Sequence, residues 1–284
     1  MSSQLKIAVI GAGTMGNGIA QTFATFGNAV TLVDTSESNL ERGVAAIRKS
    51  LDRFVAKEKI SQSESDAICD LVSTSTDLTS AVKDIDMVVE AVFENEDIKK
   101  SIFKELDDHA PKSAILATNT SSISITAIAS ATSRPEQVVG MHFMNPVPLM
   151  KLVELIKGEK TSDEVVAKTK EIAESLGKTV GVAEDYAGFI SNRVLMPMIN
   201  EAAFTLYEGV STREDIDIIM KLGMNHPMGP LTLADFIGID VCVNILDYMY
   251  EQFGDPKFRC APNMRRMVEA GKLGRKSGEG FYSY

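Results

Sequence analysis

A short apolar segment near the amino terminus of this 284-residue chain, residues 5–10, leads directly into the motif GAGTMG at residues 11–16. A buried strand that ends in G-x-G-x-x-G is typical of the first βαβ unit of a dinucleotide-binding domain. Gly11 permits the tight turn, Gly13 leaves room for a pyrophosphate beside bare backbone, and Gly16 lets the next helix pack closely. Thr14 and Met15 begin that helix, whose N–H groups point toward the phosphates. The motif therefore predicts a dinucleotide site and, with it, hydride transfer.

The residues that follow the motif agree with this interpretation. A second apolar segment, residues 29–33, ends at Asp34. Asp34 lies about 20 residues after the first glycine, where an acidic side chain hydrogen-bonds the adenine ribose 2′-hydroxyl and repels a 2′-phosphate. The alternative is that Asp34 only belongs to the N-cap region of the next helix. We therefore expect NAD rather than NADP as the cofactor.

Composition limits the other function classes. Hydrophobic residues make up 44% of the chain and charged residues 24%, as in ordinary globular proteins, and no apolar run is long enough to span a membrane. The net charge of −10 argues against a nucleic-acid partner. The three cysteines are far apart, so we expect neither a disulfide framework nor a metal site. Because the first strand leaves no room for a signal peptide, we expect a cytoplasmic protein.

Strand and helix patterns alternate up to about residue 185. Further strands are predicted at residues 85–89, 114–117, 138–141, 152–156 and 179–182, with helices between most of them. Residues 37–71 are longer than a simple crossover needs and predict a helical hairpin that breaks near residues 60 and 61. These patterns indicate an α/β fold with a Rossmann-type, doubly wound, mostly parallel sheet and a helical-hairpin insert.

The alternation stops near Gly188. Helices are predicted after it at residues 189–208, 212–222, 231–237 and 240–253. We therefore expect two domains: an NAD-binding Rossmann domain over residues 1–186, and a smaller all-α domain for substrate binding and dimerisation over residues 187–284.

Two polar residues stand out among the apolar strands. His142 follows the predicted strand at 138–141, at the edge where open α/β sheets place their ligands. An imidazole there could take the proton of a substrate hydroxyl, although a buried structural histidine is an alternative. Glu154 lies within the apolar strand at 152–156, where a carboxylate is costly to bury without a partner. Pairing with His142 would resolve that cost, whereas an edge strand would let Glu154 face water.

Two more polar residues have weaker signals. Ser121 follows the strand at 114–117 on the same rim, but serine is common in ordinary turns. Asn192 lies near the start of the first helix of the second domain, where an asparagine could also cap the helix or face solvent.

Together these segments resemble the L-3-hydroxyacyl-CoA dehydrogenase family, and within it the short bacterial members that act on 3-hydroxybutyryl-CoA. The matching segments run from end to end: GAGTMG at 11–16, TNTSS at 118–122, GMHFMNP at 140–146, GFISNR at 188–193, PMGP at 227–230 and GRKSGEGFY at 274–282. The resemblance implies interconversion of 3-hydroxybutyryl-CoA and acetoacetyl-CoA by a homodimer. It also implies that His142 and Glu154 are the catalytic base and its orienter.

The resemblance assigns further residues to the site. Ser121 and Asn192 match positions near the C3 oxygen and the thioester of the substrate, and Ser121 also matches a cofactor contact. Glu90 and Asn145 match positions near the nicotinamide. The family often has a lysine shortly after that glutamate; we place Asn95 there and expect Lys276 in the carboxyl-terminal tail to compensate.

The predicted hairpin also gains a role from the resemblance. Ser50, Arg53 and Lys57 lie on one helix face and match positions near the coenzyme A phosphates, although a solvated charged face is the alternative. Two other functions stay open. One is a β-hydroxyacid dehydrogenase acting on free acids, and the other is a non-enzymatic NADH-binding or structural relative.

Overall fold

The computed structural model describes residues 4–284, which form two compact units. The chain passes from the first unit to the second between Asp185 and Tyr186.

The first unit is built on an eight-stranded sheet in the order β3-β2-β1-β4-β5-β6-β7-β8. The strands are β1 (Lys6–Ile10), β2 (Ala29–Val33), β3 (Val72–Ser75), β4 (Met87–Glu90), β5 (Ile115–Thr118), β6 (Val138–Phe143), β7 (Leu152–Lys157) and β8 (Thr179–Glu184). Neighbouring strands are parallel except β6 and β7, which are antiparallel. The strand order changes direction between β1 and β4, where doubly wound sheets bind ligands at the carboxyl ends of their strands. The predicted Rossmann-type, mostly parallel sheet is confirmed.

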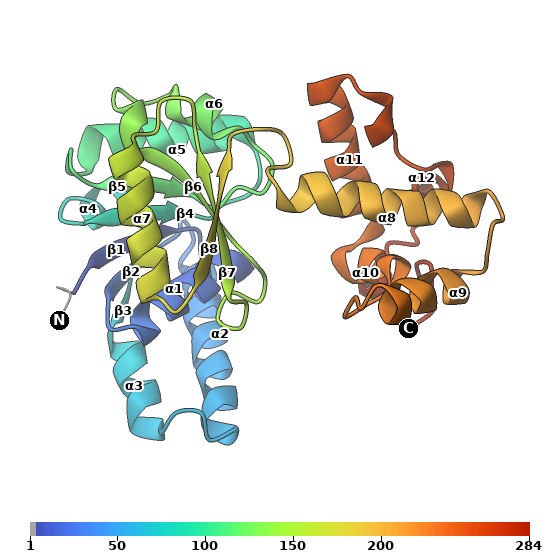
Figure 1. Ribbon diagram of the computed structural model, residues 1–284. Coiled ribbons are helices and arrows are strands. Elements are labelled where there is room, and N and C mark those ends of the chain that lie inside the picture. Colours follow the sequence, from blue (N-terminus) through green and yellow to red (C-terminus); the bar gives the residue numbers. More distant parts are fainter. Residues whose placement is uncertain (1–3) are drawn as a thin grey trace. The chain divides into compact units, whose positions relative to one another are not determined.

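Helices cover both faces of this sheet (Figure 1). One face shares an apolar core with α1 (Thr14–Thr25), α2 (Glu37–Ala56), α3 (Gln62–Asp70) and α7 (Asp163–Ser175). On the other face, α5 (Glu96–His109) packs against α6 (Ile125–Ala129), and Ile125 lies where a side chain on Gly140 of β6 would point. Between β3 and β4 lies α4 (Leu78–Ala81), a single turn. Because the central strands β1, β4 and β5 are buried on both faces, their sequences are nearly continuous apolar runs.

The predicted hairpin over residues 37–71 is confirmed. In Figure 1, α2 and α3 lie side by side and extend away from the sheet. Ser61 begins α3 with a capping box, in which its hydroxyl accepts from the Glu64 N–H and the Glu64 carboxylate accepts from the Ser61 N–H. This cap explains the break at residues 60 and 61, because it satisfies N–H groups that a new helix leaves without intrahelical partners.

Three elements differ from the sequence predictions. The sequence of β3, VSTS, is polar and was not predicted as a strand; it lies at the edge of the sheet. In the second unit, α12 (Pro262–Glu269) was also missed, because only Met264 on it is buried. The third difference is β6, which continues to Phe143 because β7 pairs with it and sets His142 directly opposite Glu154.

The second unit consists of helices joined by turns. They are α8 (Ser191–Tyr207), α9 (Arg213–Ile218), α10 (Pro230–Ile237), α11 (Ile239–Phe253) and α12. Apolar side chains from these helices and from the tail form one core, which includes Met196, Ile199, Leu231, Leu246, Met264 and Phe281. The helix predicted over residues 212–222 is α9 followed by a π-helical turn, Ile219–Gly223. The all-α second domain is therefore confirmed.

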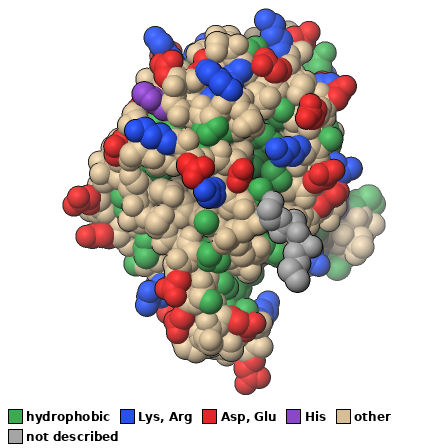
Figure 2. Space-filling model, turned by 90° about the vertical axis from the view of Figure 1, so that its left-hand side faces the viewer, with side chains coloured by type: hydrophobic (Ala, Val, Ile, Leu, Met, Phe, Trp, Pro, Cys, Tyr) green, Lys and Arg blue, Asp and Glu red, His purple; other side chains and the backbone are tan. Residues whose placement is uncertain are grey.

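The surface and the thiols add little chemistry. On the face in Figure 2, acidic and basic side chains lie interspersed. None of the helices within residues 4–284 combines the length and the apolar character that a membrane crossing requires. Cys69, Cys242 and Cys260 are free thiols, and burial raises the pKa of the Cys242 thiol to about 12.

Candidate active site

The glycine-rich loop between β1 and α1 has the geometry of a dinucleotide site. Gly11 has a φ of 101°, and a Cβ on it would lie 2.7 Å from the carbonyl oxygen of Ala91. A Cβ on Gly16 would lie 1.7 Å from the carbonyl oxygen of Gly11. Only glycine fits at these two positions, so the loop can close tightly against the start of α1.

Gly13 differs from the other two glycines, because nothing lies within 4 Å of the point where its Cβ would be. A cavity of about 280 Å³ opens beside it, lined by Ala12, Gly13, Thr14, Asn17, Asn39, Arg42 and Gly43. Bare backbone in front of open space at a helix N-terminus fits a pyrophosphate, since the first-turn N–H groups lack intrahelical acceptors. Thr14 and Met15 form that first turn.

Asp34 is held rigidly beside the glycine loop. Its Oδ2 accepts from the Ala12 N–H at 3.0 Å, and its Oδ1 accepts from the Ser36 N–H at 3.1 Å and from Nδ2 of Asn39 at 2.9 Å. The N-cap of α2 is Ser36 rather than Asp34. The carboxylate is therefore fixed at the end of β2, next to the loop, where it suits a ribose hydroxyl.

His142 and Glu154 form a side-chain pair on the two antiparallel strands. Nδ1 of His142 lies 3.1 Å from Oε2 of Glu154, and their side chains are 11% and 5% exposed. β7 is an interior strand, paired with both β6 and β8, so the alternative of an edge residue facing water is wrong for Glu154. A carboxylate beside Nδ1 favours the tautomer that carries its proton there and stabilises the imidazolium.

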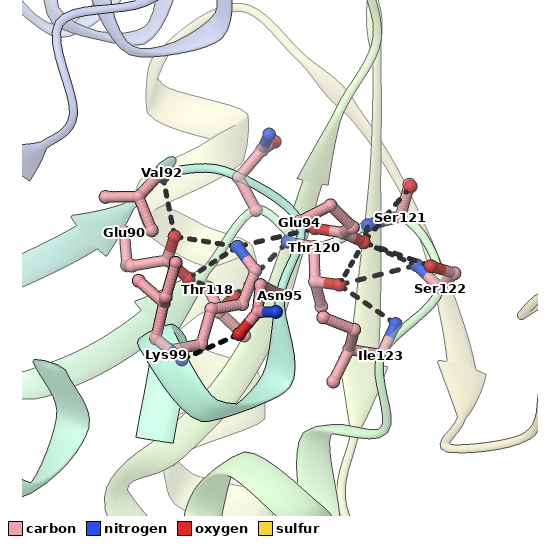
Figure 3. A network of polar contacts seen from close by, with 12 residues as sticks. Glu90, Val92, Glu94, Asn95, Lys99, Thr118, Thr120, Ser121, Ser122 and Ile123 are labelled. Atoms are coloured by element: carbon pink, nitrogen blue, oxygen red, sulfur yellow. Dashed lines mark hydrogen bonds and ion pairs between the residues drawn. The ribbon is translucent and has the colours of Figure 1, made fainter. Parts of the chain in front are cut away.

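The loop that carries Ser121 follows β5 and is organised by Glu94 (Figure 3). Oε1 of Glu94 accepts from the Thr120 hydroxyl at 2.6 Å, from the Ser121 N–H at 2.9 Å and from the Ser122 N–H at 3.1 Å. The hydroxyls of Ser121 and Ser122 also lie within hydrogen-bond distance of this oxygen. One carboxylate thus holds three successive residues of the loop in place.

Glu94 keeps its charge despite partial burial. Burial by itself raises the pKa of this carboxyl, but the charge of Lys99 and the hydrogen bonds from Thr120, Ser121 and Ser122 outweigh it. The pKa of Glu94 therefore lies below its ordinary value of 4.5.

The structure corrects the expectation that Glu90 contacts the cofactor. The Glu90 side chain is fully buried and its oxygens accept from the Lys99 ammonium, the Thr118 hydroxyl and the Val92 N–H (Figure 3). A carboxylate with these partners ties β4 to β5 and α5, and a cofactor cannot reach it. Glu94, four residues later and 36% exposed, is the carboxylate at the rim.

Asn95 lies at the start of α5, and its expected cofactor contact stays a prediction. Its side chain accepts from the Ile98 N–H and caps α5, so it has a local structural role. The lysine that we expected to be missing is present one turn later: Lys99 lies 2.7 Å from Glu90 and 3.4 Å from Glu94. Nζ of Lys276 lies 2.7 Å from Asp240 within the second unit, and its expected cofactor contact stays a prediction.

The remaining candidates occupy different settings. Asn145 is exposed and lies in the loop between β6 and β7. The end of β6 just before it is held by Asn119, whose side-chain oxygen accepts from the Phe143 N–H. Asn192 is buried in the first turn of α8, so it neither faces solvent nor serves as the N-cap, which is Ile190.

The three residues expected at coenzyme A lie at the end of α2. Ser50 is half-buried, Arg53 is exposed, and Lys57 is the exposed C-cap residue. They remain on one side of the hairpin, as a helix spacing of three and four residues requires.

Sequence reasoning missed Glu94, Lys99 and Asn119. A signal for the first two was present, because ENEDIK at residues 94–99 follows the strand end closely. The spacing alone could not separate Glu90 from Glu94, since the choice depends on the residue at which β4 ends.

Taken with the doubly wound sheet, this dinucleotide site defines an NAD-dependent oxidoreductase. Comparison with known proteins narrows the class. Residues 6–186 match the family described as 3-hydroxyacyl-CoA dehydrogenase, NAD binding domain, and residues 188–284 match its C-terminal domain. The chain belongs to the 3-hydroxyacyl-CoA dehydrogenase family, as the sequence resemblance predicted, and its cofactor is NAD.

Individual relatives align over nearly the whole chain. A probable 3-hydroxybutyryl-CoA dehydrogenase of Deinococcus radiodurans is 52% identical over 280 residues, which cover 99% of this chain and 100% of the relative. A 3-hydroxybutyryl-CoA dehydrogenase of Bradyrhizobium diazoefficiens is 49% identical over 98% of this chain and 95% of its own length. The crystal structure of the (S)-3-hydroxybutyryl-CoA dehydrogenase of Ralstonia eutropha has a TM-score of 0.96 and 47% identity, covering 99% of both chains.

Proposed function

We propose that this protein interconverts (S)-3-hydroxybutyryl-CoA and acetoacetyl-CoA, with His142 as the catalytic base and Glu154 as its orienting partner. The observation that carries the proposal is the 3.1 Å pair between Nδ1 of His142 and Glu154. It lies near the carboxyl end of β6, the edge at which this type of sheet binds its ligands. The printed names of the relatives support the substrate.

The pair can move one proton in each direction. When the Nδ1–H group of His142 donates a hydrogen bond to Glu154, Nε2 is the basic nitrogen of the imidazole. Nε2 then takes the proton of the C3 hydroxyl. Glu154 stabilises the imidazolium that results, as a carboxylate does in a Ser-His-Asp triad. In the reverse direction the imidazolium protonates the C3 oxygen of the 3-oxo substrate. Bound NAD supplies the hydride acceptor, and NADH the donor.

Hydrogen bonds from the chain would fix the reacting oxygen. We assign Ser121 to the C3 oxygen of the substrate, because its loop is held in one conformation by Glu94. We assign Asn192 to the thioester side, as the family resemblance implies. Oriented donors lower the barrier because the substrate starts close to the geometry of the transition state.

Binding residues follow from the same reasoning. Gly11, Gly13 and Gly16 would hold the pyrophosphate of NAD, and Asp34 the adenine ribose. Ser50, Arg53 and Lys57 are proposed to bind the coenzyme A phosphates at the end of α2. We keep Asn145 as a proposed contact near the nicotinamide and assign Glu94, which pairs with the buried Lys99, to that side in place of Glu90 and Asn95.

Two alternatives are less well supported. A β-hydroxyacid dehydrogenase acting on free acids relies on a lysine base in its first interdomain helix, whereas α8 offers Asn192 and Arg193 in that region. A binding or structural relative has no need of the pair between His142 and Glu154.

We also propose a homodimer in the cytoplasm. Several large apolar side chains of the second unit are exposed, and a partner copy would cover them: Val210, Ile218, Ile219, Leu222 and Met224. Three free thiols support a reducing compartment.

The test is NADH oxidation with acetoacetyl-CoA, with NADPH and free acetoacetate measured in parallel. We expect rapid turnover only with NADH and the thioester. Comparable rates with NADPH would contradict the role of Asp34 and leave the chemistry intact. Absence of turnover with the thioester, in protein that binds NADH, would contradict the proposed function.

A further inference from the structure

The loop that carries Ser121 is held at both ends by carboxylates from other parts of the chain. Glu94 holds its beginning, at Thr120, Ser121 and Ser122. Asp185 holds its other end, where the loop enters α6.

Three donors converge on Asp185. Its Oδ2 accepts from the Ser124 hydroxyl at 2.7 Å and from the Thr126 N–H at 2.8 Å, and its Oδ1 accepts from the Ile125 N–H at 3.1 Å. Backbone N–H groups in the first turn of a helix have no intrahelical acceptor. The Asp185 carboxylate serves as the acceptor for two of them, those of Ile125 and Thr126. Hydrogen bonds to an ionised group are also stronger than neutral ones.

Asp185 is itself fixed from the opposite side. Its own N–H donates to the carbonyl oxygen of Lys157 at 3.0 Å, just beyond the last residue of β8. It is also the last residue of the first unit. A tight turn follows, in which the Phe189 N–H donates to the Tyr186 carbonyl, and Gly188 and Phe189 have φ values of 78° and 48°.

We propose that Asp185 is a positioning residue for Ser121, linking the point at which the chain leaves the first unit to the geometry of the serine loop. Ser124 lies three residues after Ser121, and its hydrogen bond to Asp185, with those of Ile125 and Thr126, fixes the start of the five-residue α6 directly after the serine loop. The inference rests on the proposed function, in which Ser121 hydrogen-bonds the substrate oxygen.

The experiment is a double-mutant cycle between Asp185→Asn and Ser121→Ala, measured as kcat and KM for NADH oxidation with acetoacetyl-CoA. Asparagine has the shape of aspartate, but its amide nitrogen must face at least one of the backbone N–H groups of Ile125 and Thr126. We expect kcat to fall roughly tenfold or more, because small displacements of a reacting group are costly, while KM for NADH stays within about twofold.

The decisive comparison is made in the Ser121→Ala background. If Asp185 acts through Ser121, adding Asp185→Asn there lowers kcat by less than about twofold. Asp107→Asn is the matched control, since Asp107 also accepts from a backbone N–H, that of Ser133, and from Arg134, but holds no residue of the serine loop. The control keeps the kcat of the wild type. Should Asp185→Asn not fold, Ser124→Ala removes one of the three donors and takes its place in the cycle.

Two results overturn the proposal in distinguishable ways. If Ser121→Ala lowers kcat and Asp185→Asn lowers it by the same factor with and without Ser121, Asp185 acts elsewhere and the proposed function stands. If Ser121→Ala leaves kcat unchanged, the role of Ser121 in the proposed function fails, and this inference fails with it.

Discussion

The first unit contains two buried pairs of a carboxylate with a basic side chain, and the pairs differ in what they can do. Glu90 and Lys99 are 0% and 1% exposed, and Glu90 accepts from an ammonium, a hydroxyl and a backbone N–H. Glu154 and His142 are 5% and 11% exposed and meet through one ring nitrogen. An ammonium at neutral pH keeps its proton, whereas an imidazole can take and release one.

The comparison teaches that burial of a charged pair does not by itself identify a catalytic site. The family resemblance matched Glu90 to a position near the nicotinamide, yet its side chain ties β4 to β5 and α5. Glu154 lies in an equally apolar strand, but its partner is the one side chain type whose ordinary pKa suits proton transfer near neutrality.

The largest effect is expected for His142→Ala. Removing the base should lower kcat by roughly 10³-fold, within the range of general acid–base catalysis, while NADH still binds. Steady-state NADH oxidation gives kcat, and NADH fluorescence gives the affinity. A variant with near-normal kcat would show that another group removes the proton.

Glu90→Gln should act on stability rather than on turnover. It leaves the buried Lys99 ammonium without its main partner, which should lower the free energy of unfolding by about 3–5 kcal/mol. Glu96→Gln is the matched control, because Glu96 pairs with Lys100 at the surface, with side chains 50% and 34% exposed. That control should cost about 0.5 kcal/mol or less. Denaturant titration of both variants measures the difference, and equal losses would refute the structural role of Glu90.

Glu154→Gln should act on turnover rather than on stability. The amide keeps the shape of the carboxylate but loses the charge that stabilises the imidazolium, so we expect kcat to fall by roughly 10²-fold. KM for NADH should change little. A drop in unfolding free energy as large as that of Glu90→Gln would place Glu154 with the structural pair instead.

The smallest effect concerns the pH dependence of stability through Glu94. The pKa of Glu94 in the folded protein lies below 4.5. The contribution of this carboxylate to the free energy of unfolding is therefore complete above pH 4.5, and it is lost as the pH falls through the lowered pKa of the folded state. Glu94→Gln lacks this titration, so the stability difference between wild type and variant should shrink below pH 4.5. Denaturant midpoints at neutral pH and at a series of acidic pH values measure it, and a difference that does not vary with pH would contradict it.

The sequence predicts the parts of the site that depend on neighbours along the chain. The spacing of Gly11, Gly13 and Gly16 is local, and the structure gives each glycine the setting that its position predicts. The carboxylate in the middle of an apolar strand was also sufficient to suggest a partner for His142. Pairing of β6 with β7 supplies that partner directly across the ladder.

The features of the site that the sequence did not predict depend on where an element ends or on contacts between residues far apart in the chain. Choosing between Glu90 and Glu94 requires the last residue of β4, and strand ends are poorly defined by composition. Asp185 reaches a helix start about 60 residues earlier in the chain, as the separations of 59 to 61 residues in its hydrogen bonds record. No spacing rule could indicate that contact.

The most direct measurement is the single-turnover rate of hydride transfer for Glu154→Gln and Glu90→Gln beside the wild type. Enzyme with bound NADH is mixed with acetoacetyl-CoA, the loss of NADH absorbance is followed, and the rate is normalised to folded protein. We expect Glu154→Gln to slow the transfer by roughly 10²-fold and Glu90→Gln to match the wild type. Equal slowing of the two variants, or a slower rate for Glu90→Gln, would contradict the division between a catalytic and a structural pair.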